Sequence, residues 1–201
     1  MITPDQHNRL LGRALDPTLG WQSRCHPLSG YLPSSTVAPV YIKREDELGA
    51  NISGTKHRKY LSLLPDLELS GIRHVILIGS AHSNNVLDLA RLLKQRGIGI
   101  SALLKAPGNK ALRGNFLLLN MLLAPGSIHL LDTDQWTRAE AIGAEMVERL
   151  QAQGIAAHCL PEGGYSPPVL PGILTLAGDL QRNMAQLETG FRDIWTDSGS
   201  G

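Results

Sequence analysis

Apolar runs and helical segments alternate along most of this chain, and this alternation constrains the fold more than any other feature. The run at 74–78 (HVILI) is continuously apolar, which is typical of a strand covered on both faces of a sheet. The predicted strands are 40–43, 74–78, 98–105, 127–131, 155–160 and 193–196, and the predicted helices are 55–70, 84–96, 111–123, 135–153 and 171–189. Strands and helices in strict turn predict an α/β fold with open, mostly parallel sheets and right-handed crossovers.

Composition and charge exclude several classes of protein. The 201 residues include 19 Lys and Arg against 18 Asp and Glu, a net charge too small for a strongly basic nucleic-acid-binding surface. No stretch approaches the ~20 apolar residues needed to cross a bilayer, and the start of the chain has no apolar signal core. Cys25 and Cys159 are far apart and form no zinc motif or disulfide framework. We therefore expect a cytoplasmic protein that binds no nucleic acid, membrane or metal.

Loops beyond the carboxyl ends of the strands are the candidate sites, because ligands of open α/β sheets bind there. The first is 53–59, in which Lys56 lies in the first turn of a predicted helix and Lys59 follows on the same face. The helix N-terminus and the neighbouring ammonium group both favour the neutral form of the Lys56 amine, which an aldehyde cofactor needs to form a Schiff base. On charge pattern alone, a solvated basic run is the alternative.

Two further loops are candidates. In the loop at 79–85, Ser83 and Asn84 either face a bound ligand or simply cap the following helix. A glycine- and serine-rich turn at the end of the chain comprises Ser198, Gly199, Ser200 and Gly201. Successive backbone N–H groups in such a turn suit a phosphate, although an ordinary loop has the same composition. The segment 161–166 is either a fourth site loop or a crossover turn.

Taken in order, these segments resemble one enzyme family. YIKREDELG (41–49), SGTKHRKYLSLLPDLELSG (53–71) and HVILIGSAHSNNVLDLARLLKQRG (74–97) are similar to the 1-aminocyclopropane-1-carboxylate (ACC) deaminase and D-cysteine desulfhydrase family. RGNFLLLNMLLAPGSIHLL (113–131) and LPEGG (160–164) continue the resemblance. These are enzymes of the tryptophan-synthase-β-like fold (fold type II) that depend on pyridoxal 5'-phosphate (PLP). The resemblance therefore implies PLP as cofactor, a small amino acid as substrate, deaminase or lyase chemistry, and a homo-oligomer, expected to be a dimer.

The resemblance also implies a role for each matching residue. Lys56 matches the lysine that carries the cofactor as a Schiff base, and Lys59 matches a second, supporting lysine. Asn84 matches the asparagine that binds the phenolic oxygen of the pyridoxal ring. Ser83 matches a serine near the substrate carboxylate that acts as nucleophile or acid–base group in some members. The terminal turn, Ser198–Gly201, matches the start of the phosphate-binding loop.

Some residues depart from the family pattern. The family usually has Gly-Gly-Asn before the lysine, whereas this chain has Ser-Gly-Thr at 53–55. His82 replaces the usual glutamine, and Asn85 replaces the common histidine. Because each change lies on the substrate side, the resemblance leaves the exact substrate open.

Family members continue well past the terminal turn, which sets our expectations for the domains. We expect residues 1–60 and 164–201 to form an incomplete larger PLP domain and 61–163 to form a smaller open α/β domain. An unfinished sheet would leave an unpaired edge, which predicts poor solubility or burial against another chain. Two other functions stay open: a truncated, inactive relative of the family, and a nucleotide-binding α/β domain. The absence of a GxGxxG motif argues against the nucleotide-binding domain.

Overall fold

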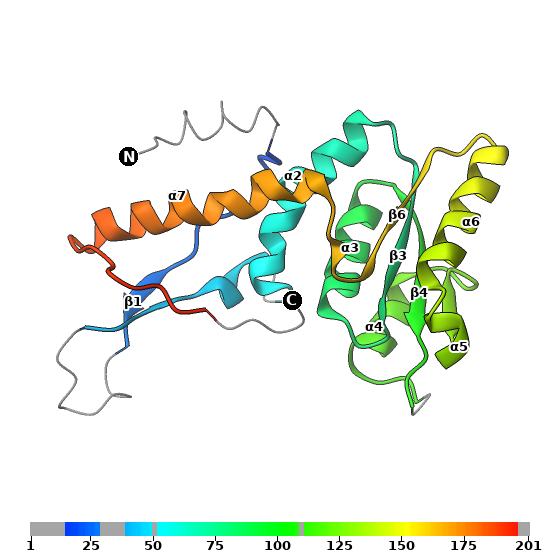
Figure 1. Ribbon diagram of the computed structural model, residues 1–201, viewed down its shortest axis with the longest axis horizontal. Coiled ribbons are helices and arrows are strands. Elements are labelled where there is room, and N and C mark those ends of the chain that lie inside the picture. The colour runs from blue at the N-terminus through cyan, green and yellow to red at the C-terminus, as the bar shows by residue number, and fades with distance from the viewer. Residues whose placement is uncertain (1–14, 29–38, 50–51, 109–110, 197–201) are drawn as a thin grey trace.

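The chain forms two packed parts with one helix between them. The computed structural model describes residues 15–28, 39–49, 52–108 and 111–196. Figure 1 shows the first part, a sheet with its covering helices, at the right of the molecule, and the second part, a long helix over a short pair of strands, at the left. The helix α2 (His57–Leu69) lies between the two parts. The α/β class predicted from the sequence is confirmed.

Four parallel strands form the main sheet, in the order β5-β4-β3-β6. The inner strands are β3 (His74–Ser80) and β4 (Gly99–Lys105), and the outer strands are β5 (Ile128–Leu131) and β6 (Ala157–Leu160). In register, His74 lies opposite Gly99 on one side and Ala157 on the other. All four carboxyl ends therefore lie at one edge of the sheet, as the alternating sequence predicts.

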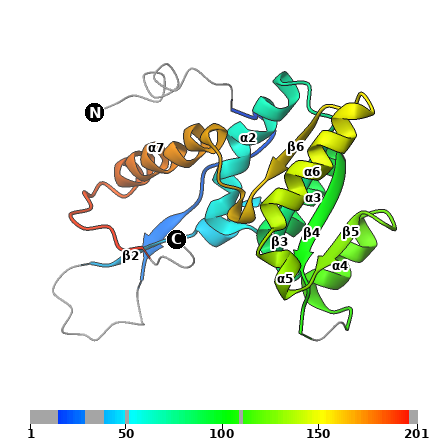
Figure 2. The same ribbon diagram turned by 45° about the vertical axis from the view of Figure 1, so that its right-hand side comes forward.

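Helices cover both faces of this sheet, which explains the continuous apolar run of β3. Alternate side chains of β3 belong to two separate core clusters, with Val75 and Leu77 in one and Ile76 and Ile78 in the other. The helices on the first face are α3 (Asn84–Gln95) and α4 (Gly114–Leu122), and the helix on the second face is α6 (Ala139–Ala152). Figure 2 shows α6 in front of the strands and α3 behind them.

The single long helix predicted at 135–153 is wrong, because a capping box starts a separate short helix. Asp132 accepts a hydrogen bond from the backbone N–H of Gln135, and the Gln135 side chain accepts one from the backbone N–H of Asp132. Reciprocal caps of this kind satisfy N–H groups that a helix start would otherwise leave unpaired. The caps begin α5 (Thr133–Trp136), and the chain turns before α6 begins.

The second part of the molecule contains the two-stranded sheet and the long helix. β1 (Cys25–Pro27), which is not among the predicted strands, pairs antiparallel with the predicted strand β2 (Tyr41–Lys43). The 3-10 helix η1 (Glu45–Glu47) follows β2, and α7 (Leu170–Gln186) packs along α2. The strand predicted at 193–196 is wrong, because residues 191–196 of the structure are neither helical nor extended in a sheet.

One face of α2 is apolar and packs into the first core cluster. Its members are Tyr60, Leu63, Leu64 and Leu67, and each is almost fully buried. Pro65 lies inside the helix without ending it. The opposite face of α2 contacts α7, so this one helix joins the two parts of the molecule.

Replacing Gly172 with alanine should destabilise the chain at the contact between α7 and α2. A Cβ atom at this position would lie 1.9 Å from the backbone oxygen of Arg58 and 3.1 Å from Oγ of Ser62. The helices would have to move apart, and we expect a loss of about 3 kcal/mol in the free energy of unfolding, measured in urea. Gly178→Ala is the matched control, because its Cβ would meet no atom within 4 Å and should stabilise α7 slightly. Equal stabilities for the two variants would contradict the packing described.

Candidate functional site

The amino-terminal ends of α2 and α3 meet beside the carboxyl end of β3. The hydroxyl of Tyr60 donates to Oδ1 of Asn85 at 2.9 Å, and the hydroxyl of Ser53 donates to the carboxylate of Asp88. All four residues are buried, and Asp88 is completely inaccessible to solvent. The two hydrogen bonds hold the loop that carries Lys56 against the start of α3. The structure thus brings together the first two loops that the sequence selected.

A third loop, beyond β6, joins the same corner. The 3-10 helix η4 (Glu162–Gly164) contacts β3, and the Nζ of Lys59 donates to the backbone oxygen of Gly163 at 2.9 Å. Gly163 and Gly164 have φ angles of +77° and +64°, which side chains rarely tolerate. A Cβ at Gly164 would also approach Nδ2 of Asn85 at 3.5 Å. The loop that the sequence left open as a site loop or a crossover turn therefore lies at the site.

The two lysines of the site have different surroundings. Lys56 ends the short 3-10 helix η3 (Gly54–Lys56) and is exposed, whereas Lys59 lies one turn further on and is half-buried. Burial lowers the pKa of the Lys59 amine, and the positive charge of Lys56 lowers it further. The two amines are therefore close enough to interact electrostatically, and the neutral form of Lys56 stays a prediction.

Ser83 is the N-cap of α3, and this arrangement leaves its hydroxyl proton available. Its Oγ accepts a hydrogen bond from the backbone N–H of Val86 at 3.2 Å. A hydroxyl that accepts through a lone pair can still donate its own proton. The capping role that the sequence suggested is therefore compatible with a contact to a ligand.

Asn84 is exposed, and its amide is held from a neighbouring helix. Nδ2 of Asn115, in the first turn of α4, donates to Oδ1 of Asn84 at 2.6 Å and to the backbone oxygen of His82 at 2.9 Å. The ring of His82 packs edge-on against Phe116, with 6.5 Å between ring centroids. Asn115 is not among the site residues predicted from the sequence. The segment RGN, which is part of the family resemblance, was the available signal.

The glycine- and serine-rich turn is the remaining group of predicted site residues. Ser198, Gly199, Ser200 and Gly201 lie outside the described residues, so their role in phosphate binding stays a prediction. The site as described comprises the start of α2, the start of α3, the loop beyond β6 and Asn115 of α4.

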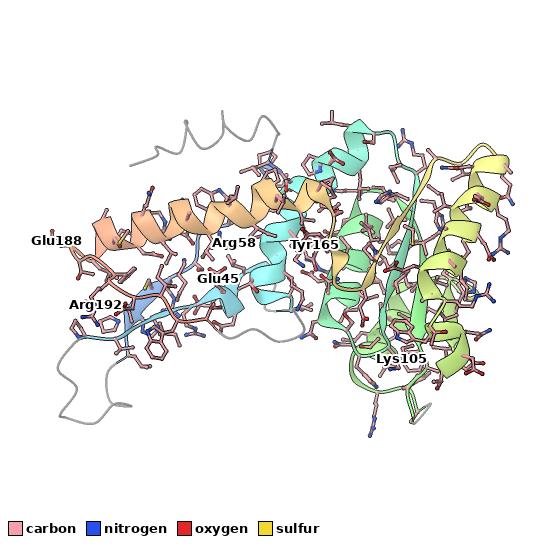
Figure 3. All side chains as sticks on the ribbon, viewed as in Figure 1. Glu45, Arg58, Lys105, Tyr165, Glu188 and Arg192 are labelled. Carbon is pink, nitrogen blue, oxygen red and sulfur yellow. The ribbon has the colours of Figure 1, made fainter. Side chains whose placement is uncertain are left out.

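A buried ionic cluster supports the site from the other side of α2. Arg58, only 2% exposed, lies in the same helical turn as the two lysines and donates to Glu45 at 2.6 and 2.8 Å and to Asp179 at 2.8 Å. Figure 3 shows Arg58 and Glu45 together between α2 and the strand pair. On charge pattern alone, a solvated basic run was the alternative for this segment, and the structure excludes it for Arg58, because this side chain is buried against partners from distant segments.

Burial raises the pKa values of Glu45 and Asp179, but their hydrogen bonds outweigh it. The Glu45 carboxylate accepts hydrogen bonds from Arg58 and Ser23, which hold its pKa below the usual range. The Asp179 carboxylate accepts from Lys43, the Ser23 backbone N–H and two arginines, with the same result. Both groups are therefore ionised at neutral pH and balance the buried guanidinium.

The described part of the chain also contains a groove that lies away from this site. A groove of about 770 Å³ runs between β2, α7 and residues 189–195, and Trp195 on its edge is 93% exposed.

Among the described residues, no cluster of three or more His, Cys, Asp or Glu could hold a metal ion. In the same residues, every helix is too short or too polar to span a bilayer.

Comparison with known proteins relates the chain to two named enzymes. No family model matches it. It is 32% identical over 162 residues to a putative ACC deaminase of Pyrococcus abyssi, covering 81% of this chain and 48% of that protein. It is 28% identical over 166 residues to the D-cysteine desulfhydrase of Salmonella choleraesuis, covering 80% of this chain and 49% of that protein.

A solved structure gives the same relationship in three dimensions. The crystal structure of an ACC deaminase homologue superimposes with a TM-score of 0.74 at 27% sequence identity, covering 87% of this chain and 53% of that one. The predicted fold class is thereby confirmed. The chain is homologous to proteins named putative ACC deaminase and D-cysteine desulfhydrase, and it spans about half the length of the curated relatives it matches.

Proposed function

We propose that this chain carries the cofactor-bearing half of a PLP-dependent deaminase or lyase that acts on a small amino acid. The observation that carries the proposal is the meeting of the Lys56–Lys59 turn with the Ser83–Asn84 corner, locked by the hydrogen bonds of Ser53 and Tyr60. The relatives named ACC deaminase and D-cysteine desulfhydrase support the same chemistry.

The described residues fit the groups that PLP presents. Lys56 offers an exposed amine for the aldehyde, and Asn84 offers an amide for the phenolic oxygen. The family resemblance assigns the binding of the phosphate group to the terminal turn, Ser198–Gly201. When bound, PLP supplies an electron sink that stabilises negative charge at the α-carbon of an amino acid.

The chain's own residues supply binding, positioning and proton transfer. Lys59 donates to the Gly163 carbonyl and so holds the loop beyond β6 against the start of α2. Ser83 can donate its hydroxyl proton to a substrate carboxylate while its oxygen caps α3. Each of these groups lies on the first turn of a helix or directly before it, so a rigid element positions it.

Two kinds of substrate follow from the names of the relatives. A D-cysteine-like substrate requires a base that removes the α-proton before the β-substituent leaves. ACC has no α-proton, so ring opening requires a nucleophile or the removal of a β-proton, and Ser83 or Lys56 would serve. His82 and Asn85, where this chain departs from the family pattern, lie at this site and bear on the choice.

We propose the same domain boundaries that the sequence predicts, with 61–163 as the smaller domain and 1–60 with 164–201 in the larger one. The packing of α7 against α2, with Arg58 hydrogen-bonded to Asp179, supports this division. A dimeric assembly and a cytoplasmic location also stay proposals, supported by the resemblance. Size-exclusion chromatography with light scattering would test the dimer.

One experiment tests the proposed function. The purified chain is mixed with PLP, its visible absorption is recorded, the bond is reduced with borohydride, and the labelled peptide is identified by mass spectrometry. We expect a visible band and a stable label on Lys56. The absence of both would favour a truncated, inactive relative of the family. Ammonia, sulfide and α-keto acid assays would then distinguish the substrates.

A further inference from the structure

Asn115 makes two hydrogen bonds whose chemistry fixes the orientation of two amides. Its Nδ2 donates to the backbone oxygen of His82 at 2.9 Å, and a backbone carbonyl can only accept. The nitrogen of the Asn115 amide must therefore face this loop. The same nitrogen lies 2.6 Å from the side chain of Asn84, so Asn84 must present its oxygen to Asn115. The backbone carbonyl of His82 thus determines, through Asn115, which way the amide of Asn84 points.

This orientation leaves the Asn84 nitrogen available. In the part of the chain that the structure describes, Nδ2 of Asn84 has no hydrogen-bond partner, although Oδ1 does. The phenolic oxygen of a pyridoxal ring is an acceptor, so it needs a donor opposite it. An Asn84 amide turned the other way would place an oxygen there and repel it.

We propose that Asn115 is a positioning residue, which turns the Asn84 amide so that Nδ2 donates to the phenolic oxygen of bound PLP. This inference rests on the proposed function and adds a residue to it. It assigns Asn115 no contact with the cofactor, because its two hydrogen bonds go to His82 and Asn84.

The first turn of α4 is well placed to hold this contact. Phe116, the next residue, is 4% exposed and packs in the first core cluster while its ring contacts His82. Gly114, the preceding residue, has a φ of +53° and lies close to the ring of His82. The backbone on both sides of Asn115 is therefore fixed against the loop that carries Asn84.

The test compares Asn115→Ala and Asn115→Asp with a matched control on the same helix. Asn120 also donates its Nδ2 to a backbone oxygen, that of Phe116 at 2.7 Å, and it lies away from the loop of Asn84. Asn120→Ala therefore removes an equivalent hydrogen bond without touching the site. Far-UV circular dichroism of all variants shows whether each one folds.

The first measurement needs no cofactor. The side-chain amide signals of Asn84 are assigned in a ¹H–¹⁵N spectrum by their loss in Asn84→Ala. We expect these signals to shift in both Asn115 variants and to stay in place in Asn120→Ala. Unchanged Asn84 signals in folded Asn115→Ala would overturn the contact and the inference with it.

The second measurement uses PLP. We expect the affinity of the chain for PLP to fall roughly tenfold in Asn115→Ala, as for one lost hydrogen bond to a charged acceptor, and further in Asn115→Asp. The absorption maximum, which reports on the phenolic oxygen, should shift in both variants. In an Asn84→Ala background, Asn115→Ala should change neither the PLP affinity nor the absorption maximum any further. If Asn115 had only a structural role, its loss would still weaken PLP binding in that background.

The outcomes separate this inference from the proposed function. Wild-type chain that is labelled on Lys56, with Asn115 variants that match it in affinity and absorption, overturns the inference alone. Wild-type chain that takes up no PLP overturns the proposed function and the cofactor part of the inference, while the amide signals still decide whether Asn115 orients Asn84.

Discussion

Lys56→Ala is expected to abolish borohydride-stable incorporation of PLP into this chain. The reaction requires an accessible primary amine, and Lys56 is exposed at the end of η3 where the starts of α2 and α3 meet. Lys56→Arg should fail equally, because a guanidinium keeps the charge but does not condense with the aldehyde. The measurement is the stoichiometry of label after reduction, followed by peptide mapping.

Two other lysines provide the controls for this result. Lys59→Ala should keep the label on Lys56 but weaken PLP binding about tenfold, because the Gly163 loop loses its charged hydrogen-bond donor. Lys105→Ala removes an exposed lysine at the end of β4, well away from α2 in Figure 3, and should behave as wild type. Label that persists in Lys56→Ala and disappears in Lys59→Ala would reassign the reactive amine.

Local patterns in the sequence predicted the elements whose causes are local. The continuous apolar run of β3 requires cover on both faces, and the structure provides it with α3 and α6. The spacing of the α2 leucines defines one buried face wherever the helix lies. The strands and helices of the sheet region were found for these reasons, with ends that differ by a few residues from those of the structure.

The errors arise where a competing local signal or a distant partner decides. The capping box of Asp132 and Gln135 outweighs helical periodicity and divides the helix predicted at 135–153. The apolar residues near Trp195 have strand-like composition, but pairing requires a neighbouring strand, which residues 191–196 do not have in the structure. Periodicity cannot reveal either effect.

The candidate site likewise contains some residues that the local sequence predicts and others that depend on distant partners. Lys56 and Ser83 could be selected from their positions after a turn and a strand, because such loops meet at the sheet edge. Asn115 could not, because its importance depends on the carbonyl of His82, 33 positions away in the sequence. The buried role of Arg58 depends on Asp179, which is 121 positions away, so the charge pattern around Arg58 could not reveal it. The sequence therefore could not predict which polar groups have hydrogen-bond partners far away in the chain.

Asp179→Ala is expected to cause the largest loss of stability, about 3–5 kcal/mol in the free energy of unfolding. The carboxylate is completely buried and accepts hydrogen bonds from Lys43, Arg58, Arg182 and the backbone N–H of Ser23. Removal leaves Lys43, Arg58 and Arg182 with Glu45 as the other carboxylate of the cluster, so the almost fully buried Arg58 loses one of its two charged partners. Stability of a single domain is typically about 5–15 kcal/mol, so the variant should be close to unfolding at room temperature.

Urea unfolding followed by circular dichroism at neutral pH measures this loss, and two comparisons identify its cause. Asp134→Ala removes an exposed carboxylate from α5 and should change stability by less than about 0.5 kcal/mol. Because the pKa of Asp179 is lower in the folded chain than its usual 3.8, its contribution is complete above that value and is lost as the pH falls through the folded-state pKa. The difference between wild type and Asp179→Ala should therefore shrink in acid. A difference that stays constant down to the lowest measurable pH would show that lost packing, and not the buried charge, destabilises the variant.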